Sequence, residues 1–327
     1  MKKLLTLLLT FALSFTLLFS LASCGNKDYK GEINVYMPDG APALAFSQLM
    51  HEENKLGKET VSYNVVSADT IGSFVANGTA TVALMPVNAA AKLCSDGKNY
   101  KMLSVNTHGN LFVIGKQEAS SLADLKGKKV GVVNLANVPG LTFKALLKKA
   151  NIEYQEEGVS ADKVTLVGIA PTEIGARLNG TGEQAIDFAV APEPAVSNLT
   201  TAAPVIKVRL SLQTLWGEGG YPQAVLMVKS ELAKDKDFTD KLLSALNESA
   251  TWVKTNVESA VTAVNAHLAE GVNPSLNASK LSATAVENCN IKVVKAKDAK
   301  SSVVDYLNRV IEIAPNATKA VGDDFFA

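Results

Sequence analysis

Three carboxylates, Asp39, Glu173 and Glu193, lie in turns that contain glycine or proline, the kind of loop that often carries binding residues. Carboxylate and amide oxygens accept hydrogen bonds, so such turns suit a neutral or cationic molecule with N–H donors. An anion is disfavoured there, because like charges repel strongly in a partly dry site. The chain has three arginines, and none lies in these turns. The residue types therefore favour an amino-bearing heterocycle over an anion.

Two further turns favour the opposite charge. Gly40-Ala41 and Pro139-Gly140 each lie where a helix is expected to begin. The first N–H groups of a helix are unpaired and carry a partial positive charge, so they can hold an anion without a basic side chain. A small sulfonate or carboxylate therefore stays open as the alternative ligand.

The chain lacks the short motifs of common catalytic sites. It contains no GxSxG, GxxxxGK[ST], HExxH or CxxC, and its three histidines lie in separate segments. Lysine and arginine number 32, as do aspartate and glutamate, so no basic excess indicates nucleic acid as a partner. The sequence predicts a binding protein without cofactor or metal, with an enzyme such as a transferase as the alternative of another class.

An internal repeat predicts the elements that position these turns. Residues 67–87 read as a loop, a short helix with an Asn-Gly stop and a buried strand ending near proline, and residues 170–193 read alike. Upstream, residues 33–42 and 129–140 each read as an apolar strand, a Gly/Pro turn and a helix start. Glycine and proline turns of this kind recur by chance, but here four elements match in the same order in the two halves. Both halves therefore predict an α/β lobe with a parallel sheet, and loops beyond the strand ends that meet in one cleft.

The last hundred or so residues are predicted to be mainly helical. Phe238, Leu242, Leu246 and Val253 share one helical face, with Asp237 as a plausible N-cap. We expect these helices to complete the first lobe.

Residues 1–23 have the layout of an export signal, with Lys2 and Lys3 before a long apolar stretch. The segment ends in Leu-Ala-Ser-Cys, which resembles the lipobox of bacterial lipoproteins, with Cys24 as the acylated residue and residues 24–30 as the tether. A plain transmembrane helix is the alternative. We therefore expect an extracytoplasmic protein anchored by lipid to the cell membrane. Export would also permit a Cys94–Cys289 disulfide, with two buried free thiols as the alternative.

The segments 121–132, 179–189 and 221–228, which include DLKGKKVGV, carry a family resemblance. They resemble the solute-binding lipoproteins of ABC transporters that serve nitrate, sulfonate, taurine and thiamine-pyrimidine-precursor uptake. The resemblance implies a periplasmic-binding-protein fold of the second type, in which two lobes, each a mixed, mostly parallel sheet flanked by helices, are joined by two crossover strands. Lobe 1 would hold residues 31–115 and 218–327, and lobe 2 residues 116–217. The resemblance further implies a protein that closes on a small ligand and presents it to a membrane permease. The expected cleft needs only one copy of the chain, so we expect a monomer.

The resemblance also implies where the ligand binds. Asp39 has an alternative role as a helix cap, Glu173 as a first-turn acid and Trp216 as a hinge packing residue; His108 is expected to be structural. The expected ligand-binding residues are Asp39, Gly40, Ala41, Thr70, Ile71, Pro86, Asn88, Asn134, Asn137, Pro139, Gly140, Thr172, Glu173, Glu193, Trp216 and Tyr221.

Overall fold

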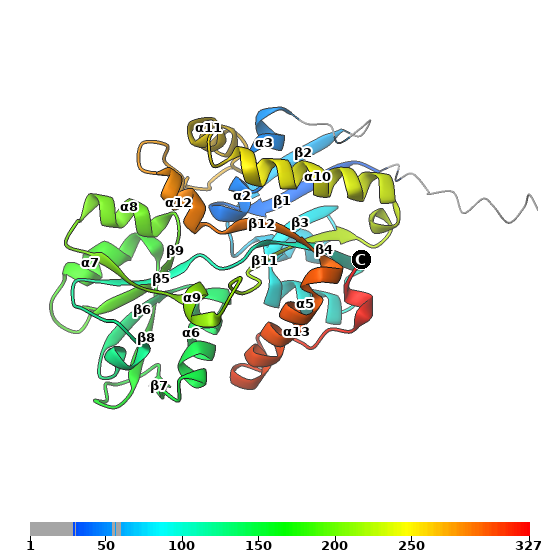
Figure 1. The fold of residues 1–327 in the computed structure, drawn as a ribbon. Helices are drawn as coiled ribbons and strands as arrows, with labels where there is room; N and C mark the ends of the chain where they lie inside the picture. Colours follow the sequence, from blue (N-terminus) through cyan, green and yellow to red (C-terminus); the bar gives the residue numbers. More distant parts are fainter. Residues whose placement is uncertain (1–28, 30, 54–55, 57–59) are drawn as a thin grey trace, which may run out of the picture.

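The computed structural model describes Tyr29, residues 31–53, Leu56 and residues 60–327 (Figure 1). The predicted signal segment and the lipidation residue Cys24 lie outside the described residues. Within the described part of the chain, no helix has the length and apolar character needed to cross a membrane. The strands form two sheets of six, which we call sheet A and sheet B.

Sheet A has the strand order β12-β4-β11-β3-β1-β2. Its strands β1, β2 and β3 are parallel, and β11 inserts between β3 and β4, antiparallel to both. The strands of sheet A are β1 (Ile33–Pro38), β2 (Val61–Val66), β3 (Val82–Pro86), β4 (Tyr100–Thr107), β11 (Ala224–Lys229) and β12 (Ile291–Lys295).

Sheet B has the order β10-β5-β9-β6-β8-β7, in which β6, β8 and β9 match β1, β2 and β3 of sheet A. Strand β5 is antiparallel to β9, as β11 is to β3. The repeat prediction is therefore confirmed, as is the α/β class with two mixed sheets. The strands of sheet B are β5 (Leu111–Gly115), β6 (Lys129–Val133), β7 (Tyr154–Gln155), β8 (Val164–Ile169), β9 (Phe188–Pro192) and β10 (Lys207–Ser211).

Strand β5 places the change of sheet slightly earlier than the predicted lobe boundary. Its hydrogen bonds run to β9 and β10, so the chain passes from sheet A to sheet B at residues 108–110 rather than after residue 115. The strand follows β4 closely along the chain, and the predicted bounds of lobe 1 included it.

Helices connect the strands and cover the sheets (Figure 1). They are α2 (Ala41–Leu44), α3 (Ser47–His51), α4 (Ile71–Ala76), α5 (Val87–Ser95), α6 (Val138–Lys149), α7 (Ile174–Asn179), α8 (Ala195–Ala202), α9 (Leu212–Trp216), α10 (Lys236–Trp252), α11 (Val257–Ala266), α12 (Ala283–Asn288) and α13 (Ala296–Ile313). The predicted Asp237 cap is wrong by two residues. The cap of α10 is Asp235, whose carboxylate accepts from the Phe238 N–H, and Asp237 instead pairs with Lys241.

Helix α13 extends the core beyond sheet A. We call sheet A with its helices the first unit and sheet B with its helices the second unit. Helices α10 and α11 pack on α3, as expected of helices that complete the first unit. Helix α13 contacts β4 and α5 of that unit and also α6 of the second unit. One apolar core therefore runs from sheet A to sheet B, through buried residues that include Phe143, Tyr221 and Tyr306.

Candidate functional site

The chain crosses between the sheets twice, and the two crossing segments lie side by side. The N–H of Tyr221 donates to the His108 carbonyl at 3.3 Å, and the N–H of Gln223 donates to the Thr107 carbonyl at 3.0 Å. Gly220 has a φ of +73°, and a Cβ on it would lie 2.0 Å from the His108 carbonyl oxygen. Only glycine fits this approach, so the crossover pair is tightly built.

Three aromatic rings pack against the crossovers, and we call Trp216, Tyr221 and Tyr306 the aromatic junction. Ring centroids lie 5.5 Å apart for Trp216 and Tyr221, 5.3 Å for Trp216 and Tyr306, and 6.0 Å for Tyr221 and Tyr306. The Tyr306 hydroxyl lies 3.0 Å from the Thr142 hydroxyl of α6. Burial raises the pKa of Tyr221 well above its ordinary value. The predicted ligand residues Trp216 and Tyr221 thus pack on α13, as the hinge alternative expects.

Glu193 links the two units where β9 ends and α8 begins. Its side chain is buried, with 3% exposed. Its carboxylate accepts from the Ser197 N–H at 3.0 Å, the Ser197 hydroxyl at 2.9 Å and the Asn288 amide at 3.4 Å. Burial raises the pKa of Glu193, against the opposing effect of these hydrogen bonds. Asn288 ends α12, which packs in the core of sheet A, so the carboxylate is held by donors from both units.

Further polar contacts lie beside Glu193, and we call Asp39, Glu193, Asn198, Ser275 and Asn288 the polar seam. Helices α8 and α12 lie side by side at this seam (Figure 1). The amide of Asn198 donates to the Ser275 carbonyl at 3.3 Å, and the Ser275 N–H donates to the Asp39 carboxylate at 2.6 Å. Asp39 and Glu193, separated widely in sequence, are thus brought to one seam.

Gly40 lies at the same place. A Cβ on it would lie 3.7 Å from Ser275 Oγ and 3.9 Å from Pro194 Cδ, and its φ is +97°. Its own N–H donates to the Asp39 carboxylate at 2.7 Å. The turn after β1 therefore faces the turn after β9, as two ligand loops of facing lobes would.

A hydrogen-bonded chain connects Glu193 to both crossovers. Asn110, in the first crossover, exchanges two bonds with the Glu193 backbone, at 2.9 and 3.0 Å. The Gln223 amide, in the second crossover, donates to Asn110 Oδ1 at 2.8 Å. The Gln223 carbonyl in turn accepts from the Val87 N–H at 3.1 Å, at the start of α5. The loop that carries Pro86 and Asn88 is therefore tied to the loop that carries Glu193.

Several other predicted site residues stabilise the structure around them. The Glu173 carboxylate accepts from the Ala170 N–H at 2.8 Å and pairs with Arg177 at 3.1 Å, and these bonds hold its pKa low. Thr70 and Thr172 are exposed, and Thr70 donates to the Ser67 carbonyl. Ala41 and Ile71 are buried in the apolar cores. The first-turn alternative for Glu173 thus accounts for its contacts.

Backbone geometry and helix capping account for the residues of the turn before α6. Asn134 has a φ of +53°, and Asn137 caps the helix by accepting from the Val138 N–H at 2.9 Å. A Cβ on Gly140 would lie 1.9 Å from the Leu135 carbonyl oxygen, so glycine is required there. Pro139 lies in the first turn of the helix, where a missing N–H costs nothing.

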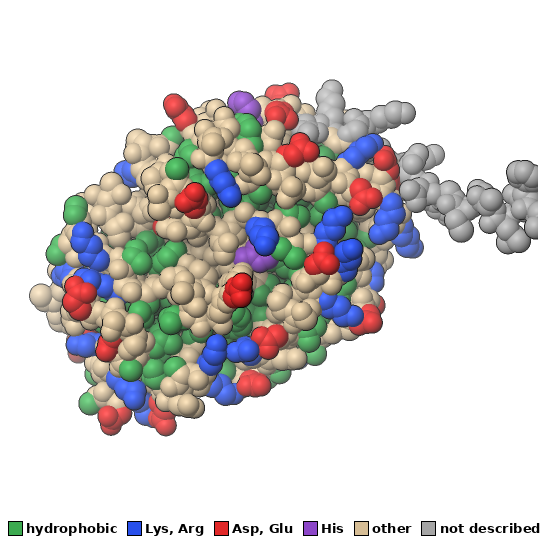
Figure 2. Space-filling model, in the orientation of Figure 1, with side chains coloured by type: hydrophobic (Ala, Val, Ile, Leu, Met, Phe, Trp, Pro, Cys, Tyr) green, Lys and Arg blue, Asp and Glu red, His purple; other side chains and the backbone are tan. Residues whose placement is uncertain are grey.

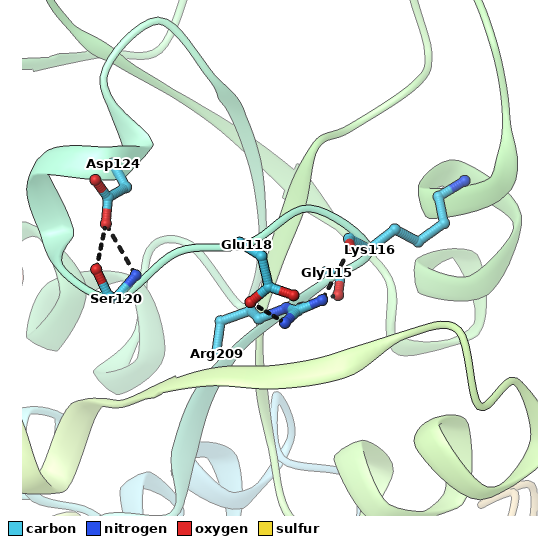
Figure 3. A network of polar contacts seen from close by, with 6 residues as sticks. All are labelled: Gly115, Lys116, Glu118, Ser120, Asp124 and Arg209. Atoms are coloured by element: carbon cyan, nitrogen blue, oxygen red, sulfur yellow. Dashed lines mark hydrogen bonds and ion pairs between the residues drawn. The ribbon is translucent and has the colours of Figure 1, made fainter.

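The arginines are all engaged elsewhere. The Arg209 guanidinium pairs with Glu118 at 2.5 Å and donates to the carbonyls of Gly115 and Lys116, next to the Ser120–Asp124 turn (Figure 3). Arg177 pairs with Glu173, and Arg309 pairs with Asp305 and lies over the Trp216 ring. Figure 2 shows acidic and basic side chains interspersed over the face it presents. An anion at the seam would therefore have no free arginine to pair with.

His108 and the two described cysteines have structural surroundings. His108 Nε2 lies 3.0 Å from the Lys292 carbonyl oxygen, and burial lowers its pKa. Cys94 and Cys289 are free thiols, so the disulfide alternative is not realised. Burial raises the pKa of Cys94 to about 11, which keeps this thiol protonated near neutral pH.

Sequence reasoning missed five residues of this region. Asn198 and Gln223 lie near predicted residues in the sequence, so a pattern argument could have identified them. Ser275 and Asn288 lie outside the internal repeat, and Asn110 lies in a crossover with no motif of its own. Ligand contact by any residue of the seam stays a prediction.

Comparisons with known proteins agree with this architecture. A family model described as "NMT1/THI5 like" matches residues 67–260, more than half of the chain. Among curated proteins, no match is found.

Solved structures share the fold at low identity. An ABC transporter protein from Parabacteroides distasonis superposes with a TM-score of 0.72 at 18% identity, covering 90% of this chain and 98% of that one. The periplasmic aliphatic sulphonate binding protein SsuA from Escherichia coli gives 0.66 at 11%, covering 89% and 90%. A putative periplasmic sulfonate-binding protein from Methylobacillus flagellatus gives 0.61 at 15%, covering 91% and 92%. The fold is thus the two-lobed periplasmic-binding-protein fold of the second type.

Proposed function

The chain belongs to the NMT1/THI5-like family, and we propose that it is the extracytoplasmic solute-binding receptor of an ABC importer. The observation that carries the proposal is the buried Glu193 carboxylate, which accepts hydrogen bonds from Ser197 of one unit and Asn288 of the other. A ligand that touches both units favours the closed form by its differential affinity for that form. The two lobes divide close to residues 110 and 217, and the protein acts as a monomer that presents the ligand to a membrane permease without transforming it.

The preferred ligand is a small neutral or cationic heteroaromatic molecule, such as a pyrimidine or thiamine precursor. Glu193 supports this choice, since a buried carboxylate favours a donor and repels an anion. The engaged arginines support it too, because none is free to balance a sulfonate.

A small sulfonate, nitrate or carboxylate is the second candidate. It is supported by the fold shared with the proteins from Escherichia coli and Methylobacillus flagellatus, which are described as sulfonate-binding. Backbone N–H groups at helix starts would have to hold such an anion.

Lipid anchoring at Cys24 is part of the proposal. It rests on the Leu-Ala-Ser-Cys segment after the apolar stretch. Acylation of the chain should appear as a mass increase on Cys24, and Cys24→Ala should release the protein from the membrane fraction.

Thermal unfolding of the chain from Gly25 onward, against heterocycles and anions, tests the receptor function. A ligand at a hundred times its dissociation constant adds about 2.7 kcal/mol, which raises the midpoint by roughly 5 °C or more. A shift with pyrimidines alone supports the preferred ligand, and a shift with sulfonates alone supports the second candidate. The absence of any shift across both panels would contradict a receptor for either class.

A further inference from the structure

Three amide side chains, one in the seam, one in the second crossover and one at the start of α5, bury a carbonyl oxygen that has no hydrogen-bond partner within the described residues. The oxygens are Asn88 Oδ1, Asn198 Oδ1 and Gln223 Oε1. Asn88 as a whole is 5% exposed. A buried acceptor without a donor is costly, and a polar site that tolerates several of them is suited to a ligand that supplies donors.

The nitrogen of each amide fixes which way the oxygen points. The nitrogens of Asn88 and Asn198 each donate to a backbone carbonyl at 3.3 Å, on Ala317 and Ser275. The nitrogen of Gln223 donates to Asn110 Oδ1 at 2.8 Å, while Asn110 is itself oriented by donating to the Glu193 carbonyl. Turning any of these amides over would set oxygen against oxygen. The unpaired group is therefore an acceptor at all three positions.

These acceptors come from both units and from neighbouring backbone. Gln223 and Asn88 adjoin, since the Gln223 carbonyl accepts from the Val87 N–H at 3.1 Å. Asn198 follows Ser197, which donates to Glu193, on the other side of the seam. Gln223 is also joined through Asn110 to the backbone of Glu193, so its amide lies in the hydrogen-bonded chain that reaches the loop of Glu193.

We infer that Gln223, with Asn88, is a specificity-determining residue that requires an N–H donor on the ligand. The inference rests on the proposed receptor function and deepens it, because it names the group on the ligand that is recognised. A ligand whose amino group is fully alkylated leaves the Gln223 acceptor unpaired, and a sulfonate brings oxygen against it. Asn110 acts as a positioning residue, since it holds the Gln223 amide in its orientation.

The experiment compares 4-aminopyrimidine with 4-(dimethylamino)pyrimidine, which has two methyl groups in place of the two N–H donors, and uses ethanesulfonate as the anion. Dissociation constants are measured by calorimetry for the parent chain and Gln223→Met. Met removes the acceptor at similar volume. Gln48→Met is the matched control, because Gln48 on α3 also buries an unpartnered Oε1 but its nitrogen donates to Glu52 rather than to a crossover residue.

We expect the parent chain to bind 4-aminopyrimidine at least tenfold more tightly than the dimethyl analogue. Gln223→Met should reduce this ratio to about twofold or less, while Gln48→Met should keep it. Equal binding of both pyrimidines, or an unchanged ratio in Gln223→Met, would overturn the inference and leave the receptor function standing. Binding of ethanesulfonate alone would overturn it as well, and binding of none of the three probes would count against the inference and the preferred ligand together.

Discussion

The two units of this protein are joined in two places of opposite character. At the aromatic junction, buried rings of Tyr221 and Tyr306 pack between α13 and α6. At the polar seam, the units meet through single amide contacts of 3.3 to 3.4 Å. Burial of apolar surface is strongly favourable, whereas a polar contact largely exchanges for one with water. The comparison teaches that the junction holds the units together and that the seam is free to open for a ligand.

The largest effect should follow from removing a ring at the junction. Tyr306→Ala deletes a fully buried side chain and should lower the free energy of unfolding by about 3–5 kcal/mol. Thermal unfolding should show a midpoint lower by roughly 10 °C. Tyr154→Ala, at the partly buried edge strand β7, is the control and should cost much less. Equal losses of unfolding free energy in the two variants would contradict the assignment of the aromatic junction as the contact that holds the two units together.

A smaller loss is expected from crowding the crossovers. Gly220→Ala combines a φ of +73° with a Cβ 2.0 Å from the His108 carbonyl oxygen, and should cost about 2–3 kcal/mol. Gly219→Ala has a φ of +81° but open space around its Cβ, so it should cost only about 1 kcal/mol. Urea unfolding of both variants separates the steric clash from the backbone strain. If the two variants lose the same free energy of unfolding, the two crossover segments are packed less tightly than their contacts indicate.

At the seam, Glu193→Gln should stabilise the ligand-free protein. The folded-state pKa of Glu193 is raised above its ordinary 4.5, so its contribution to stability is present below that value and is lost as pH rises through the folded pKa. Glutamine cannot ionise, and Ser197 and Asn288 can each reorient to satisfy its amide. The variant should therefore gain about 1 kcal/mol at pH 7 and nothing at pH 4, in midpoints measured across this range. The same variant should bind a cationic heterocycle more weakly, and a gain that is equal at both pH values would contradict the burial argument.

The smallest effect should come from the contact partner of Glu193. Asn288→Ala should change the free energy of unfolding by less than about 1 kcal/mol, while solution X-ray scattering should show a larger radius of gyration because the seam opens. Asn308→Ala, on the exposed side of α13, serves as the control and should change neither quantity. A loss of stability as large as that of Tyr306→Ala would mean that the polar seam holds the two units together as strongly as the aromatic junction does.

The internal repeat predicted much of the fold because it is a local pattern. Strands β1, β3, β6 and β9 lie where the apolar runs and Gly/Pro turns placed them. Asp39, Gly40 and Glu193 lie in turns predicted next to these strands, and the structure brings them to one seam. The four strands and their turns follow from sequence spacing, which is a property of neighbouring residues.

The rest depends on contacts between distant segments. Ser275 and Asn288 reach the seam only because α12 packs in the core of sheet A, and no spacing rule predicts that placement. Strand β12 is short and half-exposed, so its apolar signal is weak. Asp235 and Asp237 are equally good caps by residue type, and the choice between them depends on how α10 packs. Trp216 and Tyr221 were assigned to ligand binding, yet their contacts are with α13, whose position sequence did not indicate.

The insertion of β11 between β3 and β4 has a consequence for the order in which the chain folds. Sheet B is continuous in sequence, from β5 to β10, so it can complete once residue 211 is available. Sheet A cannot join β4 to β3 until residues 224–229 arrive, and it takes its last strand from residues 291–295. Pairings between distant segments close slowly, because the loop entropy must be overcome first. During synthesis the second unit should therefore mature before the first, although the first begins nearer the N-terminus.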